Sequence, residues 1–190
     1  MLTASTLLLA TFLPQGHGGA TAPVVINELS YDDSGSNNRV FVELYNVTAN
    51  PVDISGWVLQ GVDGTSVGNA AVTIPAATIL AAGGFYVVGM AAGVPNVDLD
   101  MPTMNTVCET GPDGVVLQDA QLNNIDGVVW QYARWSNAVP SWLEGDGMFG
   151  DTYNADSNPQ SASRVFDGYD TDNNGCDFRV SRWSPGTSNN

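Results

Sequence analysis

The sequence contains no lysine, only five arginines and a single histidine, His17, against 20 acidic side chains in 190 residues. The formal charge of −15 that results repels nucleic acid and anionic lipid headgroups, and it attracts divalent cations or basic partners. We therefore expect no nucleic-acid partner. An acidic, soluble surface or a salty habitat explains the same charge without any specific ligand.

Catalytic bases are scarce as well. With no lysine and the only histidine near the N-terminus, a Ser-His-Asp or Cys-His triad lacks its base. Glu28 and Glu43 are the two carboxylates that a glycosidase-like mechanism would need. Both fall in expected strands, however, where hydrogen bonds or water satisfy such side chains. The sequence therefore predicts a protein that is not an enzyme.

Cysteine is limited to Cys108 and Cys176. In an exported protein an even pair of this kind is more often a disulfide than two free thiols, and two buried thiols in a cytosolic protein are the alternative. The loop closed by the bond would be long and would stabilise the fold by about 4 kcal/mol in the chain-entropy model. Without a Cys-x-x-Cys motif or a nearby histidine, no zinc site is expected.

The first 22 residues carry no charged side chain, and Leu2 to Leu13 form an apolar run typical of a signal peptide. The run is too short to span a bilayer. We expect residues 1–22 to be an export signal or, if they are retained, a hydrophobic arm that docks on a partner or a membrane surface. Residues 23–190 are expected to form one domain, which would be periplasmic, cell-surface or extracellular.

What the chain does contain is a series of short hydrophobic stretches bounded by Asn, Asp, Ser, Gly or Pro, a pattern typical of strands. The predicted strands are Val24–Tyr31, Arg39–Asn46, Asp53–Leu59, Phe85–Gly89, Gly114–Gln118, Asp126–Tyr132 and Ser161–Phe166. In the second of them, Val40, Val42 and Leu44 share one face. Outside the leader no useful helical periodicity exists, so the fold class is all-β.

Several motifs resemble the lamin-tail domain family in order and spacing. They are Ile26-Asn-Glu-Leu29, Phe41-Val-Glu-Leu-Tyr-Asn46, Val52-Asp-Ile-Ser-Gly-Trp-Val-Leu59, Ile74-Pro75 and Leu80-Ala-Ala-Gly-Gly-Phe-Tyr-Val-Val-Gly89. Later pieces, up to Ser184-Pro-Gly186, are similar to the extended form of secreted bacterial members. The resemblance implies an immunoglobulin-like antiparallel β-sandwich with long C-terminal loops, and a role as an interaction module. We expect no catalytic domain beside it in this chain.

An acidic loop near the C-terminus predicts a calcium site. Its candidate ligands are Asp167, Asp170, Asp172, Asn174 and Asp177. Asp170, Asp172 and Asn174 match positions 1, 3 and 5 of a calcium loop, but Ser181 replaces the glutamate at position 12, so the loop is not an EF-hand. An Asx-rich turn without an ion is the alternative. A sparser loop, Glu144–Asp151, is a second candidate.

The tryptophans fall into two groups. Trp57 and Trp130 are expected in the core, whereas Trp135, Trp142 and Trp183 are candidates for a sugar-stacking surface. Together these features predict a non-enzymatic, exported structural or protein-interaction module that binds a protein partner or joins a larger surface assembly. The alternative is a calcium-dependent carbohydrate- or matrix-binding module.

Overall fold

The computed structural model describes residues 22–31, 38–65, 70–102, 107–108, 111, 113–137, 140–148 and 159–189. Residues 1–21 of the predicted export signal lie outside this range, as do residues 149–151 of the second acidic loop. The division of the chain into a leader and one domain therefore stays a prediction.

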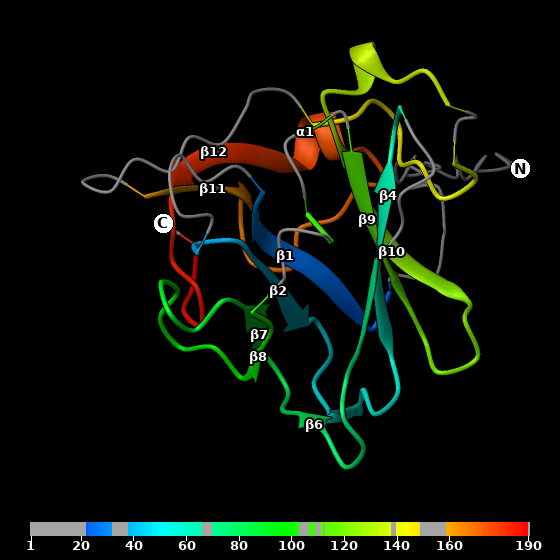
Figure 1. Cartoon of the computed structure of the whole chain (residues 1–190). Coiled ribbons are helices and arrows are strands. Elements are labelled where there is room, and N and C mark those ends of the chain that lie inside the picture. The colour runs from blue at the N-terminus through cyan, green and yellow to red at the C-terminus, as the bar shows by residue number, and fades with distance from the viewer. Residues whose placement is uncertain are drawn as a thin grey trace, which may run out of the picture.

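The described chain is built almost entirely from antiparallel strands arranged in two main sheets (Figure 1). The first sheet has the order β12 (Phe178–Arg182), β11 (Gln160–Arg164), β1 (Val24–Ser30), β2 (Phe41–Asn46), β7 (Phe85–Gly89) and β8 (Leu99–Asp100). The second has the order β10 (Asn124–Trp130), β9 (Asp113–Gln118), β4 (Val58–Asp63) and β5 (Ala71–Thr73). Strands β3 (Val52–Asp53) and β6 (Ile79–Leu80) form a small third sheet. Only the β7–β8 pair is parallel among the strands described.

Along each strand every second side chain points inward, into a hydrophobic core that the two main sheets share. Val42 and Leu44 of β2 and the preceding Val40 are at most 1% exposed and belong to this core, as predicted. Leu117 and Val128 face them from the second sheet, and β1 packs directly against β10. The all-β sandwich expected from the sequence is thus confirmed.

Large aromatic side chains fill the centre of this core. Trp130 is 0% exposed and stacks on Tyr31, with ring centroids 4.5 Å apart and planes inclined by 15°. Trp57 is also buried. The prediction that Trp57 and Trp130 are core residues is therefore confirmed.

Most predicted strands are present, and β9 and β10 pair antiparallel as expected. Two differences stand out. The strand predicted at Asp53–Leu59 lies further along the chain, because β4 begins at Val58 and continues to Asp63. Gly61 lets this strand pass close to Val107, since a Cβ at Gly61 would lie 2.4 Å from the Val107 carbonyl oxygen. Phe178–Arg182, which the sequence did not predict as a strand, pairs with β11 as strand β12.

The predicted disulfide is not formed, which corrects the expectation for Cys108 and Cys176. Cys108 is 0% exposed within the core, whereas Cys176 is exposed on the short helix α1 (Asn174–Asp177), and both thiols are free. Burial raises the pKa of the Cys108 thiol, and the charge of Asp113 adds to this effect. The even cysteine count therefore reflects one core residue and one surface residue.

Within the described part of the chain, no helix has both the length and the apolar character needed to cross a bilayer.

Because neither thiol is bonded to the other, reducing agent should leave the melting temperature unchanged. A thiol reagent should modify one cysteine per folded chain, Cys176, and the second only after unfolding, since Cys108 is buried and its thiolate is disfavoured. Thermal melts with and without dithiothreitol and counting of thiols in native and denatured protein will check this. Cys176→Ser should abolish the fast reaction. A reagent-resistant Cys176, or a melting temperature that falls on reduction, would contradict the assignment.

Candidate functional site

The most connected polar side chain in the described structure is Arg164, the last residue of β11, which is 0% exposed. Its Nη2 donates to both carboxylate oxygens of Asp126, at 3.1 and 3.0 Å. Its Nη1 donates to the Tyr169 carbonyl at 2.8 Å and to Asp170 Oδ1 at 3.2 Å. Its Nε donates to the Ile26 carbonyl at 2.8 Å, and its guanidinium lies 4.8 Å from the centre of the Phe178 ring. Every nitrogen of the guanidinium therefore has a partner.

Asp126, at the start of the buried part of β10, joins this arginine to both sheets. Its Oδ2 accepts the backbone N–H of Ile26 at 2.5 Å, and its Oδ1 accepts that of Gly127 at 2.8 Å. Burial by itself lowers the pKa of Arg164, but the charges of Asp126, Asp170 and Glu144 outweigh it and the net pKa is raised. Arg164 thus stays positively charged and links β11 to β1 and β10.

Three carboxyl groups lie close together beside Arg164. Oxygens of Asp126, Glu144 and Asp170 lie within 4.8 Å of one another, the only such acidic group among the described residues. Burial raises the pKa of Glu144, and the neighbouring charges of Asp126 and Asp170 raise it further despite the opposing effect of Arg164. Burial also raises the pKa of Asp170, although Arg164 lowers it. Glu144 and Asp170 are therefore harder to ionise than in water, because Arg164 offsets only part of the effect of burial.

Asn174, the first residue of α1, fastens the cluster to the open edge of β10. Its Oδ1 accepts the Val129 N–H at 3.0 Å, and its Nδ2 donates to the Gly127 carbonyl at 3.0 Å and to Glu144 Oε2 at 2.9 Å. The amide thus occupies the place that a neighbouring strand would take. This contact satisfies the edge of the sheet and orients Glu144.

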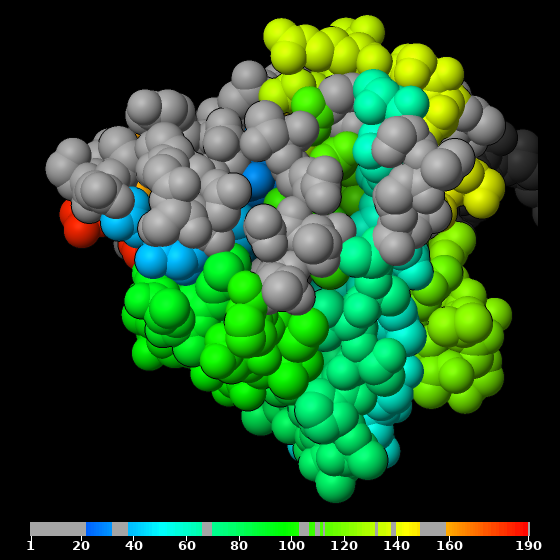
Figure 2. Space-filling model, in the orientation of Figure 1, coloured from blue at the N-terminus to red at the C-terminus, as the bar shows by residue number. Residues whose placement is uncertain are grey.

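A surface pocket of about 270 Å³ opens next to the cluster. Its polar and aromatic lining includes Asn124, Asp126, Ser141, Trp142, Glu144 and Asp172. We call it the Trp142 pocket. Residues 141–145 of the lining belong to the loop after β10, and this loop is yellow along the top and the right side of the molecule in Figure 2.

The indole of Trp142 packs on the outer surface of the second sheet. A Cβ at Gly127 would lie 2.5 Å from its Cε3 atom, and one at Gly114 would lie 2.8 Å from its Cη2 atom. Glycine at these two positions of β10 and β9 therefore makes room for the ring. Sequence reasoning had no signal for this pairing, because the residues are far apart along the chain.

The five predicted calcium ligands do not gather at one point. Asp170 joins the acidic cluster, and Asp177 lies 3.4 Å from Arg164 Nη1 and accepts from Thr171. Asn174 contacts β10, and Asp172 is exposed and lines the Trp142 pocket. Asp167 accepts instead from Asn27, Ser188 and Asn189. The cation that the acidic loop meets in the structure is Arg164, which local spacing does not reveal.

The three candidate tryptophans lie in different surroundings. Trp142 lines the pocket on the second sheet, whereas Trp183 packs against Phe41 of the first sheet, with ring centroids 6.0 Å apart. Trp135 is half-buried just after the short 3₁₀ turn Tyr132–Arg134. Trp142 and Trp183 therefore do not share a surface, and Trp142 alone of the three lines the pocket.

Glu28 and Glu43 form a second buried acidic pair, side by side on β1 and β2. Glu28 accepts from Ser161 Oγ and from the N–H and Oγ of Ser184, the last two at 2.8 and 3.1 Å. Glu43 accepts from Asn27 Nδ2 at 2.9 Å and from the Gly186 N–H at 2.6 Å. The hydrogen bonds expected for these residues are confirmed. They fix the C-terminal segment, residues 183–189, against the first sheet.

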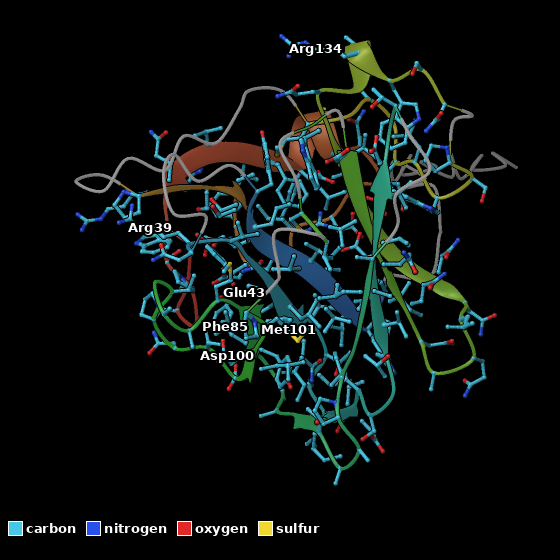
Figure 3. The ribbon with its side chains drawn as sticks, in the orientation of Figure 1. Arg39, Glu43, Phe85, Asp100, Met101 and Arg134 are labelled. Carbon is cyan, nitrogen blue, oxygen red and sulfur yellow. The ribbon has the colours of Figure 1, made fainter. Side chains whose placement is uncertain are left out.

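The electrostatic state of this pair is unusual because no cation lies among these partners. Burial raises the pKa of Glu43 to about 8, the Asn27 hydrogen bond lowers it, and the charge of Glu28 raises it again. Burial likewise raises the pKa of Glu28, against the lowering effect of its serine hydrogen bonds. Glu43 pairs with Val87 of the adjacent β7, and Figure 3 shows it well away from Arg134. The pair is a structural element separate from the Trp142 pocket.

A comparison with models of known families identifies the domain. The model of the lamin tail domain family matches residues 17–132, more than half of the chain. The chain belongs to the lamin tail domain family. Lamin tail domains are immunoglobulin-like and generally mediate protein interactions. A comparison with curated proteins finds no match.

The family match ends before several parts of the site. Asp126 and the strands β9 and β10 fall within it, whereas Trp142, Glu144, Arg164 and Asp170 follow it in the sequence. This C-terminal region of the lamin tail domain chain adds β11 and β12 to the first sheet and closes the Trp142 pocket over β10.

Removal of the central guanidinium should strongly destabilise the fold. Arg164→Ala leaves Asp126 and Asp177 buried without their cation, so we expect the free energy of unfolding to fall by about 3–5 kcal/mol. Arg182→Ala, an exposed arginine on neighbouring β12, is the matched control and should change it by less than about 0.5 kcal/mol. Urea denaturation measures both. Equal small losses for the two variants would refute the central role of Arg164.

The raised pKa values of Glu43, Glu28 and Glu144 make stability depend on pH. Each folded carboxyl binds its proton more tightly than the unfolded one, whose pKa is near 4.5. Its contribution is therefore full below that pH and is lost as pH rises through the folded pKa, which is about 8 for Glu43 and about 10 for Glu144. We expect the free energy of unfolding to be about 2–4 kcal/mol lower at pH 8.5 than at pH 5. Denaturation curves over this range test it, and Glu43→Gln should flatten the profile. A profile of the Glu43→Gln variant that runs parallel to the parent's would show that Glu43 does not titrate in this range.

Proposed function

We propose that this lamin tail domain is a non-enzymatic, exported module that binds another protein as a subunit of a periplasmic or cell-surface assembly. Membership of a family of protein-interaction domains is the observation that carries the proposal. The apolar leader motif supports export, and the charge of −15 supports a basic partner surface.

The state of the acidic side chains supports a non-catalytic role. Glu28 and Glu43, the carboxylate pair that a glycosidase-like mechanism would use, are both 0% exposed and bound by protein donors. Asp126 is held by Arg164 and by two backbone N–H groups. Groups that are tied in this way stabilise the scaffold and have no accessible substrate to act on.

A calcium-dependent carbohydrate- or matrix-binding module is the second candidate. The Trp142 pocket favours it, since an indole beside carboxylates, an amide and a hydroxyl is typical of sugar recognition. The proximity of Asp126, Glu144 and Asp170 favours a calcium ion, although Arg164 already binds two of these groups. We rank it second because the other two candidate tryptophans do not line the pocket.

The absence of lysine permits a direct test of the first candidate. A carbodiimide that joins carboxylates to amines cannot couple side chains within this chain, which has no lysine, so apart from its own N-terminal amine every cross-link marks another protein. Cross-linking of the native cell envelope followed by mass spectrometry should recover one partner whose lysines are joined to this domain. An unrelated acidic domain of similar charge is the control. Recovery of uncross-linked monomer alone would count against a protein-binding role.

A further inference from the structure

We propose that the Trp142 pocket receives a lysine or arginine side chain from the partner protein. This inference rests on the protein-binding role proposed above and names the chemistry that its partner presents. The pocket is lined by the start of β10, by residues 141–145 and by Asp172. The last two parts of this lining follow the family match in the sequence.

The walls are held rigidly before any ligand arrives. Gly114 and Gly127 seat the Trp142 ring, while Asn174 Nδ2 holds Glu144 Oε2 at 2.9 Å. Arg164 and the Ile26 N–H hold the carboxylate of Asp126 from behind. A site whose groups are already oriented loses little conformational entropy on binding.

The site offers a place for a second cation beside Glu144. Arg164 is fully buried and its nitrogens are occupied by Asp126, Asp170 and backbone carbonyls, so it has no donor directed at Glu144. The Gly127 N–H donates weakly to Glu144 Oε1, at 3.3 Å, and the side chain of Glu144 also shares a hydrogen bond with that of Asp126. Burial, followed by the charges of Asp126 and Asp170, raises the pKa of Glu144, and a cation that enters from solvent would lower this pKa and favour the charged carboxylate.

An acceptor without a partner lies beside the pocket lining. Asn173 Oδ1 is buried and has no hydrogen-bond partner among the described residues. The half-buried side chain of Asn173 packs against Gly145, which lines the pocket, since a Cβ at Gly145 would lie 2.6 Å from Asn173 Cγ. Asn173 itself does not line the pocket, so this acceptor is a neighbour of the site and not one of its contact groups.

The pocket suits an organic cation better than a metal ion or a larger ligand. Both oxygens of Asp126 already accept from Arg164, which leaves too few for the six to eight oxygens that calcium needs. A volume of about 270 Å³ is slightly below the ~300–1,000 Å³ typical of small-molecule sites and accepts the end of one side chain. An ammonium or guanidinium group needs only a few acceptors, and the Trp142 ring adds a cation–π contact.

The test uses the intact chain and N-acetyl-lysine methylamide as the probe, followed by NMR through the indole N–H resonances. The neutral N-acetyl-norleucine methylamide, calcium chloride and a neutral oligosaccharide are titrated in parallel. We expect the lysine probe to shift the Trp142 resonance, which is assigned with Trp142→Phe, and the norleucine probe to leave it unchanged. A response of Trp142 to calcium or to the sugar but not to lysine would overturn the proposal and favour the second candidate function.

Two variants of equal charge separate pocket binding from general attraction to an acidic protein. Glu144→Gln should weaken binding of the lysine probe by about tenfold, because a charge-assisted hydrogen bond is lost. Asp146→Asn, in the same loop but exposed and outside the lining, should weaken it by less than about twofold. Melting curves verify that both variants are folded. Equal weakening by the two variants would show non-specific attraction and overturn the proposal.

The same pair distinguishes this inference from the proposed function. In the carbodiimide experiment, Glu144→Gln should lose most of the cross-linked partner and Asp146→Asn should retain it. A partner that is captured equally by both variants would overturn the pocket assignment and leave the protein-binding role intact. Failure of the parent chain to capture any partner would count against the role itself.

Discussion

The buried contact between Arg164 and Asp126 is the constraint on which the rest of the structure depends. It joins the end of β11 to β10 in the other sheet, and through the Ile26 carbonyl and N–H it also includes β1. Burial of two charges is expensive, and such a pair is tolerated only when its remaining donors and acceptors are satisfied. Here backbone groups of Ile26, Gly127 and Tyr169 complete the set. These contacts fix the register in which the C-terminal region attaches to the lamin tail domain.

A second acidic contact fixes the end of the chain by different means. Glu28 and Glu43 bind Ser184 and Gly186 and so hold residues 183–189 over β1 and β2. No cation lies among their partners, so hydrogen bonds from neutral donors must offset the loss of hydration, and burial still raises the pKa of both carboxyls. The protein thus holds one acidic group with a buried arginine and the other with neutral donors.

The sequence predicts those parts of the structure that depend on neighbouring residues. Val40, Val42 and Leu44 alternate toward the core, and β9 and β10 pair across a short connection, because two-residue periodicity and local turns determine both. The site depends instead on contacts between residues 38 to 138 positions apart, as in Arg164 with Asp126 and with Ile26. The spacing of the acidic loop predicts a calcium ion, but the loop alone could not show that Asp170 and Asp177 contact an arginine of the same chain. For the same reason the cysteine count could not show that Cys108 is in the core and Cys176 is on the surface.

The arginine that organises the fold also determines what the Trp142 pocket can bind. Because Arg164 is saturated by Asp126, Asp170 and main-chain oxygens, none of its donors is left for Glu144, beside Trp142 at the solvent side of the cluster. Burial and the neighbouring carboxylates raise the pKa of Glu144, so this carboxyl gains a charge only when a cation approaches it. A carboxyl group that Asn174 orients at the pocket is consistent with a complementary cation on another molecule. The stability of the scaffold and the specificity of the surface then depend on the same small group of side chains.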